Sequence, residues 1–91
     1  MFGAILAAAA LYSSAPHYTA QPATPPAAQK IVVRDQIWYC GGAGCSAARS
    51  ASRPAIVCAS LAKEVGPLRS FSVGGTALAP ADLEKCNAKA G

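Results

Sequence analysis

Residues 52–68, SRPAIVCASLAKEVGPL, contain a full set of helix signals and decide how the rest of the chain can fold. Ser52 is a favourable N-cap, and Pro54 lies in the first turn, where its missing N–H costs nothing. Gly66 and Pro67 then end the helix. Its apolar side chains fall on one face, with Cys58 at the edge of that face: Val57, Leu61, Val65 and Leu68. The sequence therefore predicts a core helix that buries this face, while three other residues point away: Ala59, Ala62 and Lys63.

The length of 91 residues allows one small domain with a thin core, because much of the 53% hydrophobic fraction is alanine. Domains of this size commonly need disulfides, a metal ion or a partner, and the chain has four cysteines. The formal net charge of +4 permits attraction to anionic surfaces.

The N-terminal segment has the features of a signal peptide. No Lys, Arg, Asp or Glu precedes Lys30, and residues 2–12 are a continuous apolar run that is too short to span a membrane. Small residues follow, with candidate cleavage sites after Ala15 and after Ala20. We expect residues 1–20 to be a signal peptide, the protein to be periplasmic or secreted, and the mature chain to have no transmembrane span. The alternatives are an uncleaved apolar helix and a mis-assigned start codon.

The segment PHYTAQPATPPAAQ, residues 16–29, shows no apolar periodicity and little bulk. Its proline and alanine content predicts an extended linker, over residues 21–29 if residues 1–20 are removed. His17 lies here and is assigned no role. The folded domain is expected to span residues 30–89.

That domain should begin with a strand over residues 31–40, IVVRDQIWYC, in which Asp35 interrupts the alternation. Either a bulge at residues 34–35 restores the phase, or Asp35 lies at an exposed end. One face would hold Ile31, Val33, Ile37 and Tyr39. The other face would hold Val32, Arg34, Gln36, Trp38 and Cys40. Trp38 and Tyr39 could form a binding surface, although an aromatic residue beside a disulfide is more often in the core.

The remaining elements follow from turn signals. The loop GGAG between Cys40 and Cys45 predicts a hairpin, and residues 46–50 would form a short edge strand. Residues 68–73 alternate as a strand with Phe71 and Val73 inward, and a second helix starts near Pro80. The predicted fold is a small disulfide-stapled α+β domain with the order strand, short strand, helix, strand, helix.

The cysteines are separated by four, twelve and twenty-seven residues. Structural zinc sites usually need close pairs, and the redox motif CxxC is absent, so we predict no metal and no cofactor. Structural disulfides in an oxidising compartment fit better. Three connectivities are possible, and we favour Cys40 with Cys45 across the hairpin and Cys58 with Cys86 between the helices.

Catalytic residue sets are also missing from the sequence. The single His lies in the expected linker, so no Ser/His/Asp set can form, and the Gly-rich stretches lack the lysine of a phosphate-binding loop. We predict that the protein is not an enzyme and does not bind nucleic acid.

The four segments WYCGGAGC, SRPAIVCASLAKEVGPL, FSVGG and LEKCN, within residues 38–87, resemble an uncharacterised family of small exported alphaproteobacterial proteins with four spaced cysteines. The resemblance implies an exported protein of unknown function, and it brings no known active site.

Two functions remain open. The first is a non-catalytic structural or interaction module of the cell envelope, which would bind an anionic polymer or a protein partner through basic residues: Lys30, Arg34, Arg49 and Arg53. The second is a small redox accessory that uses the Cys40 and Cys45 pair.

Overall fold

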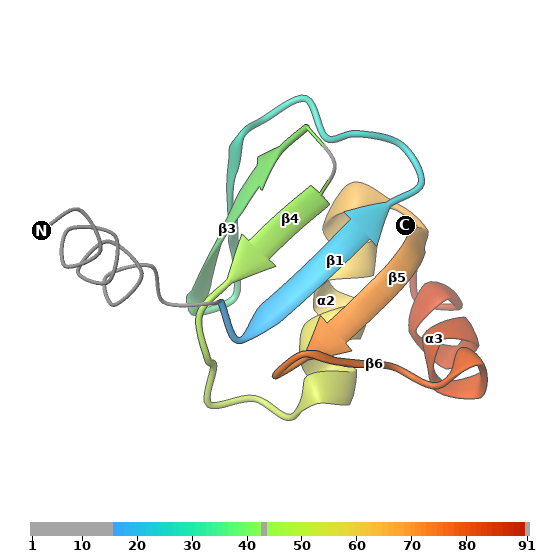
Figure 1. The fold of residues 1–91 in the computed structure, drawn as a ribbon. Helices are drawn as coiled ribbons and strands as arrows, with labels where there is room; N and C mark the ends of the chain where they lie inside the picture. The colour runs from blue at the N-terminus through green and yellow to red at the C-terminus, as the bar shows by residue number, and fades with distance from the viewer. Residues whose placement is uncertain (1–15, 43, 91) are drawn as a thin grey trace, which may run out of the picture.

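In the part of the chain that the structure describes, the fold has two layers, a six-stranded antiparallel sheet and two helices that cover one of its faces (Figure 1). The computed structural model describes residues 16–42 and 44–90. The described strands are β1 Tyr18–Pro22, β2 Lys30–Val33, β3 Gln36–Gly41, β4 Gly44–Ala47, β5 Leu68–Val73 and β6 Thr76–Ala77. The helices in this part of the chain are α2 Pro54–Val65 and α3 Pro80–Asn87. The predicted α+β class is confirmed, but the strand order is β2-β3-β4-β1-β5-β6.

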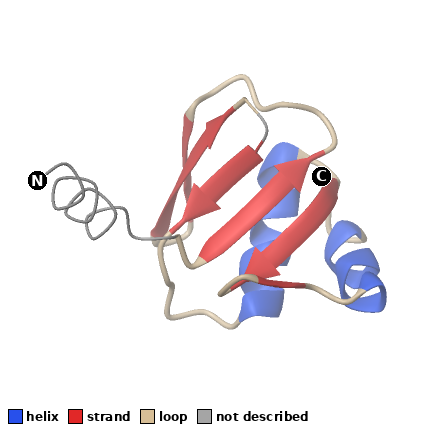
Figure 2. Ribbon diagram, viewed as in Figure 1, coloured by secondary structure: helices blue, strands red, loops and turns tan. Residues whose placement is uncertain are grey.

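Strand β1 corrects the largest error of the sequence analysis, because it lies inside the sheet where a linker was expected. Tyr18 is opposite Ala47 of β4 and Val73 of β5, so β1 joins two parts of the sheet (Figure 2). Tyr18 and Ala20 are buried, whereas Thr19 and Gln21 are exposed. The domain therefore does not start at residue 30. The expected signal peptide, residues 1–20, lies mostly outside the described residues.

The region predicted as one strand is a hairpin of two strands, β2 and β3. Arg34 has a φ of 58°, and the chain reverses at residues 34 and 35 so that Val33 lies opposite Gln36. A tight turn rather than a bulge thus explains the interruption at Asp35. The reversal also changes which residues share a face. On β3 it is Gln36, Trp38 and Cys40 that point into the core.

Strand β4 is an interior strand, not the edge strand that its Ala and Ser content suggested. Its Cys45 and Ala47 are buried, and β3 and β1 flank it on either side. Small side chains suit this position because Ala47 lies opposite both Tyr18 of β1 and Trp38 of β3, whose large rings fill the core beside it. At Gly44 the backbone of Ala20 is so close that an added Cβ would lie 2.7 Å from its carbonyl oxygen.

Helix α2 confirms the central prediction with two corrections. Val57 and Leu61 are buried, and Gly66, with φ 90°, ends the helix by donating its N–H to the Ala62 carbonyl at 2.8 Å. The N-cap is Arg53 rather than Ser52, and it makes no side-chain cap bond. Ala62, predicted to point away, is fully buried at 0% exposure, since a small side chain lets a neighbouring element approach closely.

Three aromatic side chains form the centre of the core. The ring centroids of Tyr18 and Phe71 are 5.6 Å apart, and each lies 6.2 Å from that of Trp38. These separations are typical of favourable aromatic contacts. The Trp38 indole N–H donates to the Gln36 side-chain oxygen at 3.0 Å, and the Gln36 amide N–H donates to the Ala48 carbonyl at 2.7 Å. Trp38 is therefore a core residue whose polar atom has a partner.

Strand β5 and helix α3 lie largely where the sequence predicted them. Phe71 is inward as expected, and Val73 is half-buried. Asn87 was not singled out, yet its side chain joins the end of α3 to the start of β5. The Leu68 N–H donates to Asn87 Oδ1 at 2.8 Å, and Asn87 Nδ2 donates to the Leu68 carbonyl at 2.9 Å.

Both favoured disulfides are present. Cys40 and Cys45 are directly opposite residues of β3 and β4, with Cα atoms 4.0 Å apart. Cys58 of α2 and Cys86 of α3 have Cα atoms 5.8 Å apart, so this bridge joins the two helices.

Candidate interaction surface on the open sheet face

The helices leave the other face of the sheet open, and this face is the candidate functional surface (Figure 1). Burial alternates along the strands, so one set of side chains enters the core and the next set faces outward. The outward set carries hydroxyl, amide and aromatic groups. We name it the open face, with the members Thr19, Gln21, Lys30, Val32, Ile37, Tyr39, Ser46, Ser70 and Ser72.

Strand register arranges five of these side chains in one row across the sheet. Lys30 lies opposite Tyr39, Tyr39 opposite Ser46, Ser46 opposite Thr19, and Thr19 opposite Ser72. Directly opposite residues have Cβ atoms about 4.5–5.5 Å apart, so each side chain lies within reach of the next. The row presents an ammonium group, a phenol and three hydroxyls on five adjacent strands. It combines an aromatic surface with hydrogen-bonding groups.

A hollow of about 310 Å³ lies beside this row and is lined by Pro16, His17, Tyr39, Ser46 and Arg49, with Ala47 and Ala48. A second hollow, of about 560 Å³, shares Pro16, His17 and Arg49 and extends to Thr19, Gly74 and Gly75. Arg49 and His17 therefore border both hollows. The Tyr39 side chain is 57% exposed, so its ring is available to a partner.

A backbone hydrogen bond fixes the segment around His17, which borders both hollows. Gly74 has a φ of 57° and donates its N–H to the His17 carbonyl at 2.7 Å, which joins the β5–β6 turn to the start of β1. The His17 ring contacts the Tyr18 ring edge to face, with centroids 4.7 Å apart. Because Tyr18 belongs to the core, this contact joins the His17 side of the hollow to the core.

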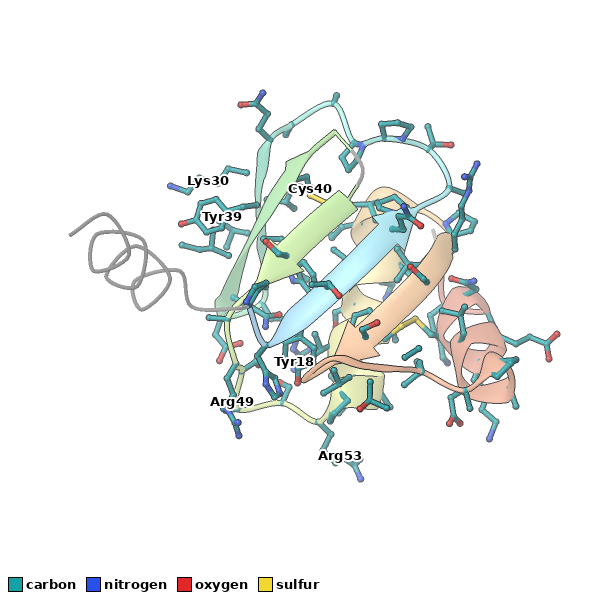
Figure 3. The ribbon with its side chains drawn as sticks, in the orientation of Figure 1. Tyr18, Lys30, Tyr39, Cys40, Arg49 and Arg53 are labelled. Carbon is teal, nitrogen blue, oxygen red and sulfur yellow. A yellow bond between two sulfur atoms is a disulfide. The ribbon has the colours of Figure 1, made fainter. Side chains whose placement is uncertain are left out.

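Three of the four basic residues predicted as anion contacts gather at one end of the sheet. Arg34 lies in the β2–β3 turn, and Gln36, which follows this turn, donates a hydrogen bond to the carbonyl of Ala48, the neighbour of Arg49. Arg53 is the N-cap residue of α2. Figure 3 shows Arg49 and Arg53 at the same end of the molecule, and Lys30 beside Tyr39 at a distance from them. Lys30 therefore belongs to the row on the open face rather than to the arginine cluster.

The acidic residues are placed differently. Asp35 lies in the turn beside Arg34, whereas Glu64, Asp82 and Glu84 lie on the helices. The end of the sheet that holds the three arginines thus carries one acid, while the helical layer holds three. This asymmetry concentrates positive charge near the hollow.

The Cys40–Cys45 disulfide lies on the opposite side of the sheet from Tyr39. Cys40 is 8% exposed and Cys45 is 3% exposed, and both point into the core. Thiol–disulfide exchange requires access of a thiolate to sulfur, which this burial restricts. Across residues 16–42 and 44–90 no group of three metal-ligating side chains comes together.

The sequence analysis missed Thr19, Ser46 and His17 as surface residues of a site. A signal for β1 was present in Tyr18–Thr19–Ala20–Gln21, which alternates large or apolar with polar residues, but four residues amid prolines are a weak pattern. Ser46 became notable only through its position between Tyr39 and Thr19.

Comparison with known proteins gives a match over residues 1–88 to a protein family described as "Family of unknown function (DUF8200)". Neither a curated protein nor a solved structure matches the chain. No helix in the described part of the chain has the length and apolar character needed to cross a membrane.

Proposed function

The chain belongs to this family of unknown function, and we propose that it is an exported, non-catalytic interaction module of the cell envelope that binds an anionic polymer. The partner would lie on the open face beside Arg49. The observation that supports this most is the hollow shared by Tyr39, Ser46, His17 and Arg49. It offers an aromatic ring, a hydroxyl and a cation in one place, on a rigid sheet.

Export is supported by the two disulfides, since such bonds persist in oxidising compartments. The structure also bears on where a signal peptide would be cut. Cleavage after Ala20 would remove Tyr18, which is 2% exposed and central to the core, whereas cleavage after Ala15 would keep β1 whole. We therefore favour the site after Ala15 and a mature protein that is periplasmic or secreted.

The alternative function, a redox accessory working through Cys40 and Cys45, has less support. The buried position of both residues favours a structural bridge, because a working disulfide must be reached by its exchange partner.

Binding to soluble polymers tests the proposal. We expect the mature protein to bind polygalacturonate or polyphosphate at low ionic strength and to bind neutral dextran much more weakly, as measured by calorimetry. The variant Arg49→Gln should weaken binding about two- to fivefold, since one cation at the hollow is lost. Tyr39→Ala should weaken it by a similar factor.

The matched control is Arg69→Gln, which removes the same charge from β5 near the opposite end of the sheet, where Leu68 lies opposite Pro22. It should leave binding nearly unchanged. Equal weakening by Arg49→Gln and Arg69→Gln would mean that only net charge matters, and it would contradict a specific surface at the hollow.

A further inference from the structure

A groove between α2 and α3, on the helical layer, is separate from the open face of the sheet. It has a volume of about 450 Å³, which lies in the range of about 300–1,000 Å³ common for small-molecule sites. The wall from α2 consists of Pro54, Ala55 and Ala59, and the facing wall contains Leu78 and Cys86. The groove exists because α2 presents small side chains here while the Cys58–Cys86 bridge keeps the helices together.

The walls of the groove are apolar, but its rim is charged. Asp82, Lys85 and Lys89 line it, all from the same side of α3 or the residues that follow it. Lys85 lines the groove from α3, and Lys89 lines it from the turn that follows the helix. Two ammonium groups against one carboxylate give the rim a net positive charge above an apolar floor.

Apolar walls together with a positively charged rim favour ligands that have a hydrocarbon chain and an anionic headgroup. An apolar groove excludes water from a hydrocarbon chain, and a cationic rim favours an anionic headgroup. The walls offer few of the hydroxyl and amide groups that the open face presents, so a polar sugar would find few partners there. We propose that the groove binds a single-chain anionic amphiphile such as a fatty acid, with its chain along Ala55, Ala59 and Leu78 and its carboxylate near Lys85 and Lys89.

Three probes with the same hydrocarbon chain test this proposal: laurate, dodecyltrimethylammonium and dodecyl maltoside, each below its micelle concentration. We expect saturable binding of laurate by calorimetry, with amide chemical-shift changes at Ala55, Ala59 and Leu78. Dodecyltrimethylammonium should bind at least tenfold more weakly, because its charge is repelled by the rim.

Variants then separate the groove from general surface charge. Ala55→Phe adds a ring at an exposed position on the wall and should block laurate binding without entering the core. Lys85→Gln with Lys89→Gln should weaken laurate binding about tenfold. The matched control, Lys30→Gln with Arg34→Gln, removes the same charge from the β2–β3 hairpin and should leave laurate binding unchanged.

The proposal is overturned if laurate does not bind saturably, if both charged probes bind equally, or if Ala55→Phe has no effect. It is also overturned if the shifts occur at Tyr39 and Ser46, because the amphiphile would then lie on the open face. None of these results depends on whether the open face binds an anionic polymer.

Discussion

The β2–β4 region and the α2–α3 region each carry one disulfide, but the two bridges act on very different neighbours. Cys40 and Cys45 are already opposite each other in a strand ladder, and their bridge closes a separation of only 5 residues. Cys58 and Cys86 lie 28 residues apart on two helices, and Cys86 is the one buried residue of α3. In the first region the disulfide adds to strands that hydrogen bonds already hold together. In the second region α3 buries few apolar side chains, so the disulfide is a main attachment of this helix.

Strand β1 connects these two regions. Its Tyr18 ring contacts both Trp38 of β3 and Phe71 of β5, and its backbone pairs with β4 on one side and β5 on the other. Trp38 and Phe71 also contact each other, with ring centroids 6.2 Å apart, so β1 strengthens a core that the two regions share.

The largest expected effect comes from breaking this connection. Tyr18→Ala should lower the free energy of unfolding by about 3–5 kcal/mol, because it removes a buried ring and leaves a cavity between the two regions. Urea unfolding followed by Trp38 fluorescence measures the change. Tyr39→Ala is the matched control and should cost far less, because Tyr39 is exposed. Equal losses from the two variants would contradict the central position of β1.

The next largest effect is expected from removing the disulfides, one bridge at a time. Replacing Cys58 and Cys86 by Ala should cost about 3.5 kcal/mol in loop entropy alone, whereas replacing Cys40 and Cys45 should cost about 2 kcal/mol. Burial of Cys58 adds a cavity cost to the first pair. Thermal unfolding of both double variants should give the lower Tm for the helical pair. A lower Tm for the hairpin pair would reverse the comparison.

The smallest effect concerns the second attachment of α3. Asn87→Ala should cost about 1–3 kcal/mol, because the N–H and carbonyl of the buried Leu68 lose their partners. Hydrogen exchange should show faster exchange at the Leu68 amide and in α3, with little change in β2–β4. Uniform loss of protection throughout the sheet would show that α3 does not open independently. Asn87→Asp is a useful comparison, since it keeps an acceptor for the Leu68 N–H but removes the donor to its carbonyl.

Local signals were sufficient where neighbours in sequence are also neighbours in space. Residues 54–65 follow a helical period that ends at glycine, and the GGAG loop places Cys40 opposite Cys45. At the candidate surface the same reasoning identified Arg49, Lys30 and Tyr39 but not the residues that lie between them. The residues that were missed come from a segment predicted to be a linker and from one predicted to be a short edge strand: His17, Thr19 and Ser46. Strand pairing brings them next to Tyr39.

The sequence by itself determined the α+β class, the core helix, the strand at residues 68–73 and the favoured pairing of the four cysteines, because periodicity, turn residues and cysteine spacing are local properties. The tertiary structure alone decided that β1 enters the sheet, that β4 is interior, and that Asn87 joins α3 to β5. The physical reason is that a strand is stabilised by its ladder partners and by the face it buries. For β1 these partners are β4 and β5, which lie far along the chain, and in residues 18–22 themselves only a short alternation indicates a strand.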